Sequence, residues 1–465
     1  MDTFSDVPVD VDQDRAFDRA FHQLQGLVDI READVLQPMG PGAIYTTGVV
    51  LWLLVTQRLQ PRSTLQTTVK HLQQIAPQLC PDNLRIREQT LSGSTAAYSG
   101  GRQRLTEETA WWFATAVSES ICESAPPTLG TRRVFLVDGT TLTTAATNPL
   151  RAEYPPSPNQ YGDSAWPAAL LVVTHELETG CAMLPEVGAK FGPNAVSEVE
   201  LARACFQRLP ASSIVLADAG FGIFSVAWAA TGCGHSYLLR LTAQRFKALL
   251  GKSDKVATGE LDTGDDWTTY SCVWKPSPKD RKTNPYLPAD AVLKVRLHEI
   301  RLPDGEPLYL LTDLSEDTTT LKKIYGKRMD VETDIRNIKV VLDMEHIRAL
   351  TPAMFRKELL TSMVAYNLVI QFRRQAARLA KVPPRRLSFT SVWNTFRIVL
   401  LSKCSTDPAE WRNHYRRALH MAIRDKLPNR PGRHFEREAY RRTSKPSHFK
   451  KRSPPKHKTN QPPPK

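Results

Sequence analysis

Two short apolar runs, each followed directly by an aspartate, constrain the fold of this chain more than any other feature. "VFLV" precedes Asp138 and "IVLA" precedes Asp218, and a glycine follows each aspartate within two residues. Short continuous apolar runs are typical of strands that are buried on both faces, so they predict a sheet covered by helices. A carboxylate at the end of such a strand packs poorly but can hold a hard cation. A cap of a helix or turn is the alternative role for each aspartate.

The pattern around these runs predicts an α/β sheet with helical regions before and after it. The hairpin "AALLVVTHELETGCAMLPEVG" is expected to turn near Glu178–Gly180, and a helix and two further strands follow it. The predicted organisation is a helical region at 1–130, a first core part at 131–242, a β-rich insertion at 243–307, a second core part at 308–350, a helical C-terminal region at 351–427 and a disordered basic Pro-rich tail at 428–465.

Two helix starts are predicted from capping residues. Thr106 precedes two acidic residues and a long apolar pattern, which is typical of an N-cap. Thr351 stands before Pro352, so a helix is expected to begin there with proline at its first position. The pair Pro383–Pro384 is expected to stop this second helix.

The net charge of +14 is concentrated near the C-terminus. Residues 430–465 hold twelve Lys or Arg against two Glu, and the other 429 residues carry only about +4. A polyanion, most commonly nucleic acid, is therefore an expected partner, and a solubilising tail is the alternative. The seven cysteines are scattered and form no CxxC pair, and no signal peptide or membrane span is visible in the sequence. These features predict a soluble cytoplasmic protein.

The segment "IYGKRMDVETDIRNIKVVL" at 324–342 mixes acids, bases and a phenol in an expected helix. At about 100° per residue, Asp330 and Asp334 lie on one side and are expected to be solvated. The other face carries one carboxylate among three bases and a tyrosine: Tyr325, Arg328, Glu332, Arg336 and Lys339. This face suits a metal-binding carboxylate beside a phosphate-binding array. The alternative is a surface helix in which Glu332 pairs with Arg328 and Arg336.

The order Y-x2-R-x3-E-x6-K, at Tyr325, Arg328, Glu332 and Lys339, resembles the YREK signature of the insertion-sequence DDE transposases. "VDGTTLTT" and "LADAGFG" resemble the first and second acidic motifs of that family, and the order, spacing and insertion agree over about residues 40–380. The chain departs from many relatives at Met329, where they carry tryptophan.

This resemblance implies a ribonuclease-H-like core that carries out cut-and-paste transposition. Asp138, Asp218 and Glu332 would bind Mg²⁺, for which Mn²⁺ can substitute, with two ions in each active site. The family hydrolyses a phosphodiester at each transposon end, and the freed 3′-hydroxyl then attacks DNA. The expected DNA-contacting residues are Tyr325, Arg328, Arg336, Lys339 and, for stacking on a flipped base, Trp267 or Trp274. Packing in the insertion is the alternative for both tryptophans.

The expected partners are the terminal inverted repeats of a transposon and target DNA, in association with the bacterial nucleoid. Cleavage of both ends in one complex implies a homodimer on DNA. Three rival functions remain open: a silent DNA-binding regulator derived from a transposase, a structure-specific nuclease, and a structural scaffold. An intact acidic triad argues against the regulator, and the charged face at 324–342 argues against the scaffold. Only a strand-transfer product separates a transposase from the nuclease.

Overall fold

The structure is a computed structural model. It describes residues 29–428 except 61–62, 160–161, 253–258, 265, 304, 342–346, 402–407 and 425. The predicted basic tail lies, apart from its first residue, outside the described residues, as do the first 28 residues of the helical N-terminal region.

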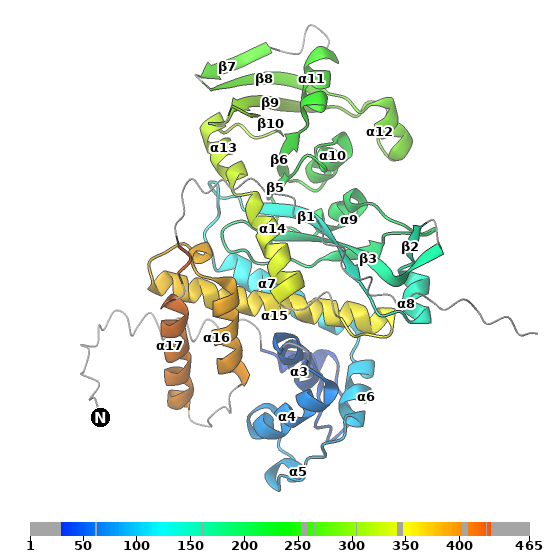
Figure 1. Ribbon diagram of the computed structural model, residues 1–465, viewed down its shortest axis with the longest axis vertical. Coiled ribbons are helices and arrows are strands. Elements are labelled where there is room, and N and C mark those ends of the chain that lie inside the picture. The colour runs from blue at the N-terminus through cyan, green and yellow to red at the C-terminus, as the bar shows by residue number, and fades with distance from the viewer. Residues whose placement is uncertain are drawn as a thin grey trace, which may run out of the picture. The chain divides into compact units, whose positions relative to one another are not determined.

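The described chain contains a ten-stranded mixed sheet, whose strands lie in the upper half of Figure 1. The strands run in the order β2-β3-β1-β5-β6-β10-β9-β8-β7, and β4 pairs with β3. Their bounds are β1 (Val134–Thr143), β2 (Pro156–Asn159), β3 (Gly162–Glu176), β4 (Glu186–Ala189), β5 (Ile214–Ala217), β6 (Ser236–Leu241), β7 (Gly259–Gly264), β8 (Trp267–Trp274), β9 (Leu293–Arg301) and β10 (Pro307–Thr312).

The predicted α/β class is confirmed by the first half of this sheet. Strand β1 is parallel to β5, and β5 is parallel to β6, while β3 is antiparallel to β1. Helices α9 (Glu198–Phe206) and α10 (Phe224–Gly232) connect β4 to β5 and β5 to β6. This mixed sheet with helical regions before and after it is the ribonuclease-H-like arrangement that the resemblance implied.

The segment 243–307 extends the same sheet. Strand β10 pairs with β6 on one side and β9 on the other, and β8 and β7 continue from β9. The segment also contains two helices, α11 (Ala243–Lys252) and α12 (Pro278–Thr283). The hydrogen bonds of the sheet therefore continue from the core into this segment, and Arg245 of α11 donates to the carbonyls of Ala219 and Gly222 in the loop after Asp218.

Helical regions precede and follow the sheet in the sequence. The two predicted N-caps are confirmed. The side chain of Thr106 accepts a hydrogen bond from the backbone amide of Thr109, and that of Thr351 accepts one from the amide of Met354. The bounds are α2 (Glu32–Leu36), α3 (Thr47–Leu59), α4 (Leu65–Leu79), α5 (Leu84–Arg87), α6 (Ala96–Arg104), α7 (Glu107–Glu123), α8 (Asn148–Glu153), α13 (Thr318–Gly326), α14 (Met329–Arg336), the π-helical turn Asn337–Val341, α15 (Pro352–Leu379), the 3-10 turn Pro384–Arg386, α16 (Phe389–Leu401) and α17 (Pro408–Arg424).

Helix α15 runs through the middle of the molecule. Every residue from Lys357 to Ala377 is buried, and the helix packs against α3, α7, α16 and α17 (Figure 1). It ends at Leu379, before the prolines that were predicted to stop it. No helix among the described residues is long and apolar enough to cross a membrane.

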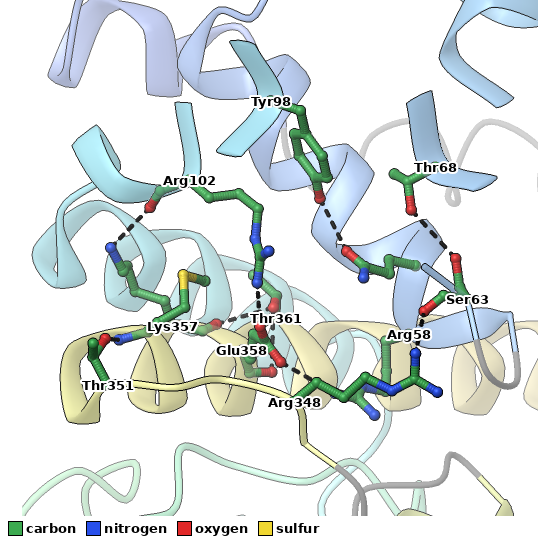
Figure 2. Close-up of polar contacts among 12 residues, drawn as sticks. Arg58, Ser63, Thr68, Tyr98, Arg102, Arg348, Thr351, Lys357, Glu358 and Thr361 are labelled. Carbon is green, nitrogen blue, oxygen red and sulfur yellow. Dashed lines mark hydrogen bonds and ion pairs between the residues drawn. The ribbon is translucent and has the colours of Figure 1, made fainter. Parts of the chain in front are cut away.

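The charged residues of α15 join it to the N-terminal helices (Figure 2). Glu358 forms ion pairs with Arg102 of α6 and Arg58 of α3, and all three side chains are at most 13% exposed. Lys357 donates to the carbonyls of Arg102 and Leu105 at 2.9 and 2.8 Å, which satisfies the C-terminal end of α6. Buried charges need such partners, so this network specifies how the N-terminal helices meet the core.

We predict that Glu358→Ala destabilises the protein by about 3–5 kcal/mol, because two buried guanidinium groups lose their common carboxylate. Thermal or urea unfolding measures the loss. The control is Asp82→Ala, which removes an exposed partner of Arg87 and is expected to cost less than about 1 kcal/mol. Equal losses in the two variants would contradict a specific role of the buried network.

Candidate active site

The sheet register brings the two strand aspartates together. Val137 of β1 and Ala217 of β5 form the last pair of the parallel ladder, so Asp138 and Asp218 are the next residues on strands about 4.8 Å apart. The prediction that Asp138 ends its strand is wrong, since β1 continues to Thr143 by pairing with β3. Only its ladder with β5 ends there, which leaves the β5 side of β1 open beside Asp138.

The predicted single helix over 324–342 is also wrong. Helix α13 ends at Gly326, and α14 starts at Met329 after a tight turn in which the amide of Arg328 donates to the carbonyl of Tyr325. The segment is therefore interrupted between Gly326 and Met329 and is not one regular helix. Arg328 lies at the start of α14, and Glu332 lies one turn further along it.

Arg328 is the residue on which the three predicted acids converge. Its Nη1 lies 2.7 Å from Oε1 of Glu332. Its Nη2 lies 3.3 Å from Oδ2 of Asp218 and 3.6 Å from Oδ2 of Asp138. The Arg328 side chain is only 13% exposed. The surface-helix alternative expected the pair with Glu332, but it does not account for the two contacts with strands of the sheet. No ion pair joins Glu332 to Arg336 among the described residues.

Burial works against the negative charge of Asp138. It raises the pKa of that carboxyl to about 6, although the Gly139 amide and Arg328 favour the charged form; Asp218 and Glu198 add to the rise. The Gly139 amide donates to Asp138 at 2.8 Å, and the Gly220 amide donates to Asp218 at 2.8 Å. The positive charge of Arg328 therefore does not fully offset the effects of burial and of the neighbouring carboxylates on Asp138.

Glu198 is a neighbour of this site that the sequence did not indicate. It is the first residue of α9, and its carboxyl group lies over Gly139. A Cβ atom added at Gly139 would be 2.6 Å from Cδ of Glu198, so a larger residue there would displace the end of this glutamate side chain. The glycine after Asp138 was the available signal, but the sequence does not show which side chain lies above it.

The donor set fits a divalent cation. Three carboxylates supply the oxygen ligands that Mg²⁺ prefers, and burial, with the neighbouring carboxylates, raises the pKa of Asp138. Within the described ranges no three acidic, histidine or cysteine side chains lie close enough together to hold an ion. The carboxylates are instead arranged around the guanidinium of Arg328, which occupies the position of a counter-charge.

The other predicted residues lie at different depths around this centre. Tyr325 lies in the last turn of α13 and is buried, and burial raises its pKa to about 12, so its phenol remains a hydrogen-bond donor at neutral pH. Arg336 is exposed on α14, and Lys339 is half-buried in the π-helical turn. Tyr325, Arg336 and Lys339 thus belong to three consecutive elements, and Tyr325 lies near enough to Arg328 and Asp218 for their charges to act on its pKa.

The two tryptophans lie at opposite ends of β8. Trp274 is 7% exposed and packs edge-on against Phe224, which agrees with the packing alternative. It lines a cavity of about 880 Å³ that also involves Gly220, near Asp218, and Arg245. Trp267 is half-buried and lines a second cavity of about 550 Å³ with Arg301 and Tyr309.

The prediction that Asp330 and Asp334 are solvated is wrong. Asp334 is completely buried, and both aspartates pair with Arg385, which lies beyond α15. The sequence did not indicate this partner, because Arg385 follows Asp334 by 51 residues in a Pro-rich turn.

We predict that Asp138→Asn stabilises the metal-free protein at pH 7–8 by about 1–3 kcal/mol, since a shift of one pKa unit corresponds to about 1.4 kcal/mol. Asparagine resembles the protonated carboxyl, whose pKa is about 6 in the folded protein and near 3.8 in the unfolded chain. The gain is therefore expected to shrink as the pH falls through 6 and to vanish below 3.8. Urea unfolding across this range measures it, and a pH-independent gain would contradict the assignment.

Two comparisons relate the chain to known proteins. The family model described as the transposase DDE domain matches residues 129–368, which is more than half of the chain. Among solved structures, the chain is distantly similar to a cryo-EM structure of the piggyBac transposase synaptic complex with hairpin DNA. The two share 12% identity over 90% of this chain and 86% of that one, with a TM-score of 0.38. No curated protein sequence matches. By the extent of the domain match, this chain belongs to the family of transposases with a DDE domain.

Proposed function

We propose that this protein is a transposase that binds the terminal inverted repeats of a transposon and catalyses metal-dependent DNA cleavage and strand transfer. The observation that carries the proposal is the convergence of Asp138, Asp218 and Glu332 on Arg328 at one open end of the β1–β5 ladder. Membership of the DDE transposase family supports it.

Three carboxylates have the role of metal ligands in this proposal. Asp138, Asp218 and Glu332 would hold Mg²⁺, or Mn²⁺ in its place, and two bound ions would activate the attacking oxygen and stabilise the leaving oxygen of the phosphodiester. The two aspartates come from adjacent strands, so the backbone ladder orients both of them. Glu332 approaches from α14 and completes the set. Arg328 balances their charge in the free protein and is placed to bind a phosphate of the DNA.

Other basic and aromatic groups supply DNA contacts. Arg336 and Lys339 follow Glu332 along the chain and would bind backbone phosphates, and the Tyr325 phenol would donate a hydrogen bond. Trp267 is the stronger candidate for stacking on a flipped base, because Trp274 is almost completely buried. The cavity beside the Asp218 loop has Arg245 and Lys279 in its lining, which would favour a DNA strand there.

The DNA complex is proposed to contain two copies of the chain, since two transposon ends must be cut together. The C-terminal helices α16 and α17 expose Ile398 and Met421, whose side chains are 59% and 55% exposed. We propose these two helices as the assembly surface.

We predict that Glu332→Gln lowers the rate of Mg²⁺-dependent nicking at least ~10³-fold, because the loss of one ligand removes several kcal/mol of transition-state stabilisation. DNA binding is expected to survive, since glutamine removes only one negative charge. A labelled duplex carrying the end of the element, incubated with protein and Mg²⁺, reports nicking and end joining on a gel, and a mobility shift reports binding.

The matched control is Asp163→Asn, which neutralises an exposed acid at the start of β3 and is expected to cleave like the native protein. Nicking without joining by the native protein would favour the structure-specific nuclease. Binding without cleavage in every variant would favour the silent regulator and would refute the proposed catalytic function.

A further inference from the structure

The helix that carries Glu332 is held from its opposite face. Asp330 and Asp334 lie two residues before and after Glu332 on α14. At about 100° per residue, a step of two residues turns a side chain by about 200°, so both aspartates point away from the direction of Glu332. They point toward the body of the protein, where Asp334 is completely buried.

Arg385 binds both of these aspartates. Its Nη1 and Nη2 lie 2.9 and 2.8 Å from the two carboxylate oxygens of Asp334, which is a bidentate pair. Its Nε lies 3.0 Å from Oδ2 of Asp330. The planar guanidinium therefore restricts α14 at two points one turn apart, which a single flexible ammonium group does not achieve.

The turn that carries Arg385 is itself fixed to the core. Arg373 of α15 donates from Nε and Nη2 to the carbonyl of Leu387 at 3.0 and 2.6 Å. On the other side of the pair, Gly180 has a φ of +74°, and a Cβ atom there would lie 3.5 Å from Nη2 of Arg385. The Tyr366 hydroxyl donates to the Gly180 carbonyl at 3.0 Å. Both sides of the ion pair are thus tied to α15.

We infer that Arg385 is a positioning residue for Glu332: it sets the rotation and height of α14 above the sheet, and so where the glutamate meets Asp138 and Asp218. This inference rests on the proposed function. Arg385 lies outside residues 129–368, the matched transposase domain, so the C-terminal region would complete a site whose ligands all come from that domain. Rotation of α14 would break a buried bidentate pair, which makes the orientation of Glu332 costly to change.

The test separates positioning from stability by removing both charges of the pair. The double variant Asp334→Leu/Arg385→Met replaces the buried ion pair with apolar side chains, a change that proteins often tolerate. Arg385→Lys, a second variant, keeps the charge but loses the planar fork. Glu332→Gln is the reference for a lost ligand. The control is Arg386→Met in the same turn, since Arg386 pairs with neither aspartate in the described part of the chain.

Two measurements are made on each full-length protein: thermal unfolding, and titration with Mn²⁺ followed by electron paramagnetic resonance of the free ion. The double variant is expected to unfold within a few degrees of the native protein and to bind Mn²⁺ about 10–100-fold more weakly, as outer-shell changes typically do. Arg385→Lys is expected to show a smaller loss, and Arg386→Met none.

Native Mn²⁺ affinity in both the double variant and Arg385→Lys would overturn the inference, even where unfolding temperatures fall. A different result would refute the proposed function: equally weak Mn²⁺ binding by the native protein and by Glu332→Gln. The positioning role of Arg385 would then be refuted as well. If the native protein binds Mn²⁺ and Glu332→Gln does not, the proposed metal site stands. Native Mn²⁺ affinity in the double variant would then refute only the role of Arg385.

Discussion

The structure depends on the burial of α15 together with its charged side chains. A helix buried over 21 consecutive residues, Lys357–Ala377, cannot leave its polar groups without partners, because an unpaired buried charge is very unfavourable. Several of these polar side chains therefore form ion pairs or hydrogen bonds with other parts of the chain. Glu358 selects α3 and α6, Asn367 bonds the amide and carbonyl of Ala182, and Arg373 bonds the carbonyl of Leu387. Hydrophobic packing brings these elements together, and the polar contacts specify their orientation.

The candidate active site shows the opposite balance. Its carboxylates gather where the β1–β5 ladder ends, with only one guanidinium to offset them, and burial raises the pKa of Asp138 to about 6. Such an arrangement lowers the stability of the free protein and suits a centre that acquires further positive charge. It is the trade between stability and activity that active sites commonly show. Two supports hold the carboxylates close together despite their repulsion. They are the β1–β5 ladder and the ion pairs between Arg385 and the aspartates of α14.

Much of the site was predictable because it follows from local rules. An apolar run ending in an aspartate indicates a buried strand with a carboxylate at its edge, and that rule found Asp138 and Asp218. The helix caps Thr106 and Thr351 were predictable for the same reason, since capping depends on residues within four positions. The grouping of Glu332 with the aspartates came from a family resemblance, and the single helix expected over 324–342 is interrupted between α13 and α14.

The sequence by itself determined the α/β class, the helical ends and the two acidic strands, because hydrophobic periodicity and capping act over short distances. Only the tertiary structure decided that the insertion extends the core sheet, since pairing between β6 and β10 joins residues about 70 apart. It also decided that Arg328 lies among three carboxylates, that Glu198 covers Gly139, and that Asp334 is buried against Arg385. These contacts depend on how a strand register and a helix rotation combine, and no local pattern encodes that combination.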